Sequence, residues 1–467
     1  MALSLQEFNQ QIHLKFVPAL DPNFKPAAVW LAAFAKKAKA LQGPQQTIAI
    51  MREHQTLFST KVQLLPLTPE FAALNFFLLE RLCKYLLWSK GGHTIFIPGQ
   101  KELAQKLQTH YQTVRKFDDD LIGVQVYGQN LRFTSEEIPA VPPPHFPPCK
   151  KQADGCRVGI DLGGSDRKFA AVKDGEVVQT GEILWDPYHQ PDPNYHLTQI
   201  DDCIAQAAQH LDHVDAIGVS SAGIYVANEV KVGSLFRGVA PADFKAKIAP
   251  LFKTLQKKWG NVPLVVANDG DVTALAAAYS SGQVPVLGVA MGTSLAAGYI
   301  NENYAITGQL NELAFVPVDF RPDAPCDEWS QDSGVGVNYF SQQAVARLIK
   351  QTTLPIDQNL PFPQQLVAVQ ELMKKDDPQA AAIYETIGTY LGYTIPLYYQ
   401  FDPFKQLLLL GRVMTGKGGE IMQAKAQEVL AAEFPSLAAQ IHFGQVSERD
   451  KRHGQAVAAA FLPEIKK

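Results

Sequence analysis

Two short stretches of apolar residues, each closed by glycines, stand out in the hydrophobic pattern of the chain. Residues 158–172 (VGIDLGGSDRKFAAV) begin with an apolar run, turn through Gly163 and Gly164, and resume as a second apolar run. Apolar runs of about four to eight residues bounded by turn residues are typical of buried strands. The pattern therefore predicts a strand, a tight glycine turn and a returning strand.

The chain contains this pattern twice. Residues 287–294 (LGVAMGTS) align without gaps on residues 158–165 (VGIDLGGS), which predicts two related lobes that face each other. Glycine turns let backbone N–H groups approach an anion closely. Asp161 precedes the first turn and is placed to hold Mg²⁺, directly or through water, whereas Ala290 stands at that position in the second copy. We expect the first copy to handle metal and phosphate and the second copy phosphate alone.

Residues 1–134 have a different pattern, which predicts an α+β arrangement. The predicted elements are helices at 26–40, 68–88, 100–108 and 111–121, a strand at 94–97 and a hairpin at 124–133. This order is also that of a winged helix-turn-helix, whose two helices would come from residues 102–107 and 113–116. Against DNA binding, three aspartates at residues 118–120 would repel phosphates from the supposed recognition helix. An accessory domain that packs on the catalytic lobes is the alternative.

A proline-rich segment marks the main domain boundary. Six of the ten residues from Pro139 to Pro148 are proline, which predicts a stiff connector without sheet hydrogen bonds. The predicted domains are an accessory domain at 1–134, a linker at 135–156, a first lobe at 157–285 and a second lobe at 286–467.

Small and polar residues follow two further predicted strands. The strand at 214–219 leads into Ser221 and Gly223, which leave room for a ligand at the strand's carboxyl end. The strand at 262–266 leads into Asn268-Asp269-Gly270-Asp271 and a helix. Helix capping needs only one such residue, so four polar or glycine positions in a row favour a site. Asp269 is the candidate general base for phosphoryl transfer to a hydroxyl group.

The composition is that of a globular protein of 467 residues, with 46% hydrophobic and 19% charged residues. The net charge of −4 gives no general attraction to nucleic acid or to anionic membranes. Five cysteines without a CxxC pair predict reduced thiols in a cytoplasmic protein rather than a disulfide framework. We expect no signal peptide and no membrane partner, because the first residues lack the signal pattern and no apolar run reaches transmembrane length.

The order of five segments resembles the ROK family of bacterial sugar kinases and sugar-responsive repressors. These segments are DLGGS at 161–165, SSAGIY at 220–225, NDGDVTALAA at 268–277, AMGTSLAAGYI at 290–300 and NELAF at 311–315. The resemblance implies an α/β fold with two actin-like (ribonuclease H-like) lobes around a cleft that holds ATP and a sugar. It implies ATP- and Mg²⁺-dependent phosphorylation of a hexose-like hydroxyl group, with Asp269 as the catalytic base.

The candidate site residues fall into three groups. The sugar would contact Ser221, Gly223, Asn268, Glu312 and Asn338. The nucleotide would contact Gly163, Gly164, Ser165, Lys168, Gly292, Thr293, Ser294, Gly411 and Arg412. The metal would be held by Asp161. The family assignments of Asn268 and Glu312 are a sugar-hydroxyl contact and the acid of a glycine-glutamate segment.

The chain departs from the family pattern at several positions. Phe315 stands where the family has a zinc-binding histidine, and Cys326 stands alone in place of a cysteine-rich motif, so we expect the protein to contain no zinc. Asn338 replaces a second sugar-binding glutamate, and Arg412 replaces a glycine. Three acids follow Cys326 and form either a replacement rim of the sugar site or a solvated acidic loop: Asp327, Glu328 and Asp332.

Three functions remain open at this point. The first is a carbohydrate kinase, and the second is a sugar-responsive transcriptional regulator that uses the N-terminal region on DNA or a protein. The third is a catalytically weak sugar sensor. The sugar, its phosphorylated hydroxyl and the oligomeric state, including a homodimer, are not determined by the residues.

Overall fold

The first lobe is built on a five-stranded mixed sheet. The computed structural model describes residues 3–53, 56–444 and 448–465. The strand order is β11-β8-β5-β6-β7, and β5, β8 and β11 are parallel, so their carboxyl ends lie at one edge of the sheet. The strands are β5 (Cys156–Leu162), β6 (Asp166–Lys173), β7 (Glu176–Leu184), β8 (Ala216–Ser221) and β11 (Leu264–Asn268).

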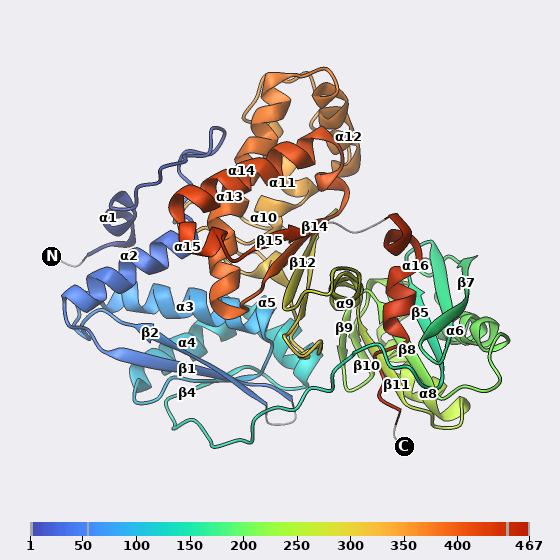
Figure 1. Ribbon diagram of the computed structural model, residues 1–467. Helices are drawn as coiled ribbons and strands as arrows, with labels where there is room; N and C mark the ends of the chain where they lie inside the picture. The colour runs from blue at the N-terminus through green and yellow to red at the C-terminus, as the bar shows by residue number, and fades with distance from the viewer. Residues whose placement is uncertain (1–2, 54–55, 445–447, 466–467) are drawn as a thin grey trace.

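Helices cover both faces of this sheet. Helices α6 (Pro193–Ala208) and α8 (Leu251–Lys258) pack on one face, and the closing helix α16 (Glu448–Ala459) packs on the other against β5, β6 and β8 (Figure 1). A side chain on Gly159 or Gly218 would collide with the backbone of α16. These two glycines therefore allow the C-terminal helix to lie directly on the sheet.

The second lobe repeats the plan with a four-stranded sheet in the order β13-β12-β14-β15. The strands are β12 (Val286–Met291), β13 (Leu295–Ile300), β14 (Gln406–Leu410) and β15 (His442–Gly444). The helices are α9 (Asp269–Ser281), α10 (Val337–Phe340), α11 (Gln342–Ile349), α12 (Phe362–Met373), α13 (Pro378–Phe401), α14 (Lys417–Glu433) and α15 (Pro435–Ala438). The α/β class predicted from the sequence is confirmed.

The N-terminal segment forms its own four-stranded sheet in the order β2-β1-β3-β4. Its elements are α1 (Leu5–Gln10), α2 (Ala27–Ala40), β1 (Gln45–Met51), β2 (Leu57–Gln63), α3 (Ala72–Ser89), β3 (Thr94–Phe96), α4 (Lys101–Thr113), α5 (Lys116–Asp118) and β4 (Arg132–Thr134). Its apolar side chains join those of the second lobe in a single hydrophobic core. Figure 1 shows these elements in blue and cyan beneath the second-lobe helices.

Backbone and charged contacts tie the two parts together. The N–H of Ala27 donates to the carbonyl of Val318 at 2.9 Å. Asp21 accepts hydrogen bonds from Arg321 at 2.6 Å and from the Tyr390 hydroxyl at 2.7 Å. The first 134 residues thus pack on the second lobe, and the irregular residues 138–152 then lead to β5 in the first lobe.

Two sequence predictions in this segment are wrong. The helix predicted at 111–121 is interrupted at residues 114–115 and resumes as α5. The hairpin predicted at 124–133 is absent, because Asp119–Val126 forms a π-helix. The chain reverses after it, where the N–H of Gln129 donates to Gly123 and the N–H of Leu131 donates to the Asp119 carboxylate. Strands β1 and β2 were not predicted. No helix in the described part of the chain is long and apolar enough to cross a membrane.

Candidate active site

Asp161 lies near the end of β5 at the shared edge of the parallel strands. Its side chain is buried and accepts a hydrogen bond of 2.7 Å from the hydroxyl of Ser220 on β8. Burial raises the pKa of Asp161 to about 6, and the negative charge of Asp269 adds to the rise. The positive charge of Lys168 on β6 lowers the pKa of Asp161 and so limits this rise. The Lys168 ammonium group itself pairs with Asp166 at 2.5 Å. Because burial disfavours the charged form of Asp161, a cation bound nearby would stabilise its carboxylate.

The two glycine turns are present, but they differ by one residue. In the first hairpin Leu162 pairs with Arg167, whereas in the second Met291 pairs with Leu295. The second turn is therefore one residue shorter, although the aligned letters match.

Both turns use the N–H of their first glycine internally. Gly163 donates to the carbonyl of Asp166 at 2.9 Å, and Gly292 donates to the carbonyl of Ser294 at 2.9 Å. These two N–H groups are therefore already hydrogen-bonded within their own turns. The partly exposed Gly164 and the exposed Ser165 lie in the first turn, and the exposed Thr293 and Ser294 lie in the second.

Asp269 is the first residue of α9, directly after β11. Asn268 caps the helix, since its side-chain oxygen accepts from the N–H of Gly270 at 2.7 Å. The same N–H lies 3.0 Å from Oδ1 of Asp269. Burial raises the pKa of Asp269, and this N–H limits the rise. Helix α9 packs on β13 through Gly298, because a side chain there would collide with the backbone of Gly270.

Two more carboxyl groups surround Asp269. Burial raises the pKa of Glu312 to about 7, and the charges of Asp269 and Asp271 raise it further. Burial also raises the pKa of Asp271 to about 7. Asp271 accepts hydrogen bonds from the N–H of Tyr299 at 2.9 Å and from Asn311 at 2.8 Å. These two hydrogen bonds fix the orientation of the Asp271 carboxyl group.

Of the remaining residues predicted to contact the sugar, some lie beside Asp269 and one lies elsewhere. Asn268 donates to the carbonyl of Gly223 at 2.8 Å, and the buried Ser221 accepts from the Tyr225 hydroxyl at 2.6 Å, so these residues adjoin Asp269. Asn338 instead lies on α10, where it donates to the carbonyl of Pro325 at 3.2 Å. The structure therefore brings Asn268, Ser221 and Gly223 together and ties Asn338 to a different loop.

Gly411 and Arg412 follow β14, beside the second turn. Gly411 has a φ of +93°, and a side chain there would collide with the backbone of Met291 at the end of β12. Arg412 is exposed, and its carbonyl accepts from the side chain of Gln370 at 2.9 Å. Gly411 is thus adjacent to the second turn, while the Arg412 side chain points to solvent.

The position of the family's zinc histidine is filled by an aromatic cluster. The ring centroid of Phe315 lies 4.4 Å from that of Trp88 and 5.1 Å from that of Trp329. The ring of Phe117 completes the cluster, 4.8 Å from Trp329 and 6.0 Å from Trp88. Trp88 and Phe117 come from the N-terminal segment, so this segment packs against the residue that replaces the metal ligand.

Buried ions adjoin these aromatic rings. Asp332, which is fully buried, pairs with Arg81 at 3.2 Å, with Lys84 at 3.2 Å and with Arg115 at 2.5 Å. Lys84 also pairs with Asp118 at 2.7 Å. The expectation of a solvated acidic loop is wrong for Asp332. Of the two basic residues in the supposed recognition helix, Arg115 is bound to buried acids, whereas Lys116 is exposed and pairs with Asp120.

Comparisons with known proteins agree with this geometry. The profile of the ROK family matches residues 157–460, which is well over half of the chain. This chain belongs to the ROK family. The resemblance found in the sequence and the two-lobed fold it implies are thereby confirmed. No match is found among curated proteins.

Two solved ROK structures are similar in fold. A ROK hexokinase from Thermus thermophilus has 16% identity and a TM-score of 0.51, and the match covers 66% of this chain and 98% of that chain. A ROK family transcriptional regulator, a homolog of the E. coli MLC protein, also has 16% identity and a TM-score of 0.51, and the match covers 82% of this chain and 96% of that chain. The second match exceeds what the ROK region alone supplies, so it extends into the N-terminal segment.

Proposed function

We propose that this ROK chain is an ATP-dependent carbohydrate kinase that phosphorylates a hydroxyl group of a hexose-like sugar. The observation that carries the proposal is the convergence of Asp161 and Asp269. They lie at the carboxyl ends of β5 and β11, two strands separated only by β8. The first glycine turn follows β5 and the second follows β12, and each of these strands is an inner strand of its sheet. The charge of Asp269 influences the pKa of Asp161, which places both carboxyl groups in one electrostatic environment.

Asp269 would accept the proton of the attacking sugar hydroxyl. Phosphoryl transfer needs a base oriented on the hydroxyl group and electrostatic stabilisation of the phosphoryl charge. The N–H of Gly270 holds one carboxylate oxygen of Asp269, which leaves the other for the sugar. Burial makes Asp269 a stronger base than an exposed aspartate, because its pKa is raised.

Asn268 and Glu312 would position the sugar. Asn268 has one side-chain N–H beyond the one that bonds Gly223, and Glu312 presents a partly buried carboxyl group whose pKa responds to the charge of Asp269. Hydrogen bonds to hydroxyl groups would compensate for the burial of Glu312. Asn338 is a weaker candidate because its side chain already bonds Pro325.

The nucleotide would lie between the two turns. Since Gly163 and Gly292 use their N–H groups internally, the phosphate donors would be the following N–H groups of Gly164 and Ser165 in one turn and of Thr293 and Ser294 in the other. Gly411 lies beside the second turn, where it would border the adenosine.

Mg²⁺ fits the residues at the end of β5. The buried Asp161 carboxylate is a hard oxygen donor, and the hydroxyl of Ser220 orients it through a hydrogen bond of 2.7 Å. When bound, Mg²⁺ would neutralise charge on the phosphates of ATP. Lys168 would add a second positive charge near the same turn.

A direct test is a coupled assay of ADP release with Mg·ATP over hexoses, amino sugars and polyols. The proposal expects one class of sugar to give turnover well above the ATPase background. Saturable sugar binding by calorimetry without turnover would instead support the catalytically weak sensor. Neither turnover nor binding with any sugar in the panel would contradict both.

A regulator is the second candidate, because the match to the ROK regulator extends into the N-terminal segment. Against it, the helix predicted at 111–121 is interrupted at residues 114–115, and Arg115 is bound to the buried Asp332. We expect the full chain not to retain specific fragments from a pool of genomic DNA at about 0.15 M salt. Sequence-specific retention that a sugar releases would favour the regulator.

A further inference from the structure

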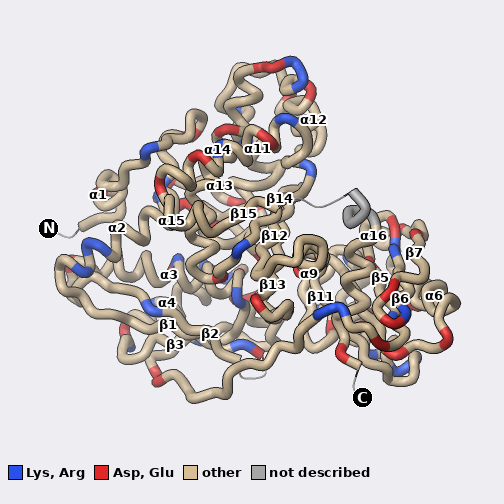
Figure 2. Tube along the Cα trace, viewed as in Figure 1, with Lys and Arg blue, Asp and Glu red and all other residues tan. Residues whose placement is uncertain are grey.

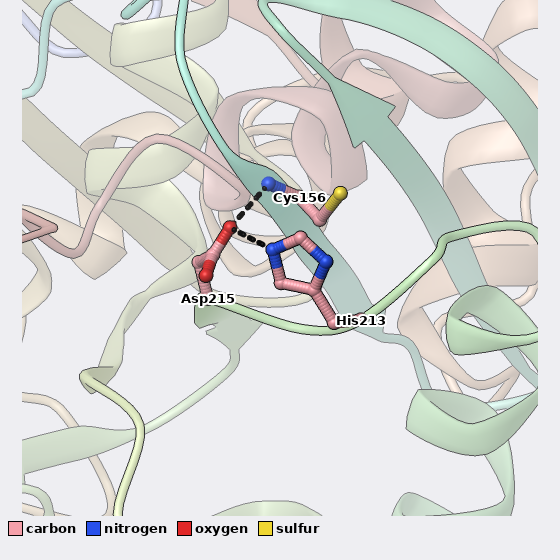
Figure 3. Close-up of side chains that lie close together, drawn as sticks. All are labelled: Cys156, His213 and Asp215. Atoms are coloured by element: carbon pink, nitrogen blue, oxygen red, sulfur yellow. Dashed lines mark hydrogen bonds and ion pairs between the residues drawn. The ribbon is translucent and has the colours of Figure 1, made fainter.

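Three metal-ligating side chains meet at the amino-terminal end of β5, far from the candidate active site. Figure 3 shows Cys156, His213 and Asp215 side by side. One ligand atom from each, a thiol sulfur, an imidazole nitrogen and a carboxylate oxygen, lies within 4.8 Å of the other two. Within the described ranges, this is the one group of three or more such residues that could hold a metal ion.

The backbone fixes two of these residues in place. Strand β5 pairs with β8 in parallel register, with Arg157 opposite Ala216, so Cys156 and Asp215 are neighbours across the strands. The N–H of Asp215 donates to the carbonyl of Cys156 at 2.8 Å, and the N–H of Cys156 donates to Oδ2 of Asp215 at 2.8 Å. A hydrogen bond of this kind orients a carboxylate as a supporting shell does around a metal.

His213 completes the group from the loop before β8. Its Nε2 lies 3.0 Å from Oδ2 of Asp215, and its side chain is 65% exposed. Cys156 is buried, so an ion would enter from the side of His213 and Asp215. Ligand atoms of a tetrahedral zinc ion lie about 3.3–3.8 Å apart, given bonds of about 2.0–2.3 Å. The ligand atoms lie within 4.8 Å of one another, so binding would draw the group together by about 1 Å, and the exposed imidazole is free to take part in that movement.

The sequence analysis expected no zinc because the family's zinc ligands are replaced, but this group lies elsewhere in the fold. We propose that Cys156, His213 and Asp215 bind one Zn²⁺ ion, with water at the fourth position. A thiolate, an imidazole and a carboxylate are the ligands zinc uses, and thiolate and imidazole disfavour Mg²⁺ and Ca²⁺. On binding, the Cys156 thiol releases its proton to solvent and the sulfur forms the metal bond.

The neighbouring charges are compatible with a cation. Lys173 faces Cys156 across the β5–β6 pair, but its ammonium group is bound to Asp212 at 2.6 Å. Asp154 adds a further acid close by, 3.6 Å from Arg157. The site therefore has no unbalanced positive charge among these neighbours.

The site lies where three parts of the chain converge. Cys156 ends the proline-rich linker and begins β5, and a side chain on Gly155 would collide with Ile465 near the C-terminus. A bound ion would fasten the linker to β8. Asp161 lies five residues further along β5, roughly 17 Å away at about 3.3 Å per residue, so this inference is independent of the kinase proposal.

Cobalt(II) is the probe for the test, because a thiolate ligand gives cobalt an intense near-ultraviolet charge-transfer band. Tag-free, reduced protein freed of metal with a chelator is titrated with Co²⁺ and then with Zn²⁺. We expect the band to saturate at one equivalent, visible bands typical of tetrahedral cobalt, and loss of both on addition of one equivalent of Zn²⁺.

Variants assign the ligands. Cys156→Ser should abolish the near-ultraviolet band, and His213→Ala should weaken Co²⁺ binding by at least about tenfold. The matched control is Cys326→Ser, which removes the exposed thiol at a distant loop and should leave both bands unchanged. His213 is exposed, so its variant tests the site even where Cys156→Ser impairs folding. No saturable band, or a band that survives Cys156→Ser and disappears in Cys326→Ser, would overturn the proposal.

Discussion

Arg81 of α3 and Asp332 of the second lobe, 251 residues apart in sequence, form a buried ion pair with a distance of 3.2 Å between Nη1 and Oδ1. Glu80 pairs with Arg81 and Arg115 at the same place. In Figure 2 the positions of charged residues are spread over the whole trace. The group around Asp332 joins the N-terminal segment to the second lobe. Burial raises the pKa of Asp332, but Arg81, Lys84 and Arg115 outweigh it and hold the pKa below its usual value.

Asp332→Asn should destabilise the protein strongly. The substitution leaves three buried cations with too few anions, and breaking a buried pair costs about 3–5 kcal/mol. We expect the thermal midpoint to fall by several degrees in differential scanning calorimetry. Glu136→Gln is the control, because it breaks the exposed pair with Arg132 and should change little. Equal midpoints for the two variants would show that the buried pair does not hold the segment to the lobe.

Glu312→Gln should change how stability depends on pH. The folded-state pKa of Glu312 is raised to about 7 from its ordinary value of 4.5, so the folded state binds the proton more tightly. Its contribution is therefore fully present below about pH 4.5 and is lost as the pH rises through about 7. We expect Glu312→Gln to melt higher than the parent chain at pH 8 and to lose part of the decline between pH 5 and pH 8. Glu302→Gln, at an exposed position, should keep the parent profile. An unchanged profile in Glu312→Gln would mean that the carboxyl group is solvated.

Features of the fold and the site that depend on residues close together in sequence can be predicted from the sequence, whereas those that depend on distant residues cannot. The hairpins around Gly163 and Gly292 and the convergence of Asp161 with Asp269 follow from local apolar patterns and from the parallel strands those patterns imply. The pairing of Arg81 with Asp332 cannot be predicted in this way, because an isolated arginine or aspartate in a sequence is typical of a solvated surface. The shorter second turn was also hidden, since the aligned letters end at the turn itself. The π-helix at Asp119–Val126 has a strand-like pattern of apolar residues, and long-range packing decides its conformation.

Asp269→Asn should lower kcat by roughly 10²- to 10⁴-fold, with the KM for sugar changed far less. The amide keeps the size and the hydrogen bond from Gly270 but cannot accept the hydroxyl proton. Turnover is measured with the sugar that the ADP-release screen identifies. Asp323→Asn, at an exposed position in the same lobe, is the control and should retain full activity. Near-normal kcat in Asp269→Asn would remove the base assignment.

Gly298→Ala should displace helix α9 and with it Asp269. The added methyl group would collide with the backbone of Gly270 and Asp271, so the helix must move away from β13. We expect a lower thermal midpoint together with a loss of kcat. Gly288→Ala is a matched control from the paired position on β12, because a methyl group there would lie at an ordinary contact distance of 3.6 Å from Ala274. If both variants behave alike, the close approach of α9 to β13 does not position the base.

Asp161→Asn should raise the Mg²⁺ concentration needed for half-maximal turnover by about tenfold or more, because the amide is a weaker ligand for a hard cation than the carboxylate. Stability should not fall, since burial raises the pKa of Asp161 and the amide removes a buried charge while keeping an acceptor for Ser220. This combination separates a metal role from a structural one: a structural carboxylate would lower the melting temperature and leave the Mg²⁺ dependence unchanged. Asp174→Asn, in the exposed turn between β6 and β7, should alter neither measurement. An unchanged Mg²⁺ requirement in Asp161→Asn would place the metal away from β5 and leave the asymmetry between Asp161 and Ala290 without a functional reason.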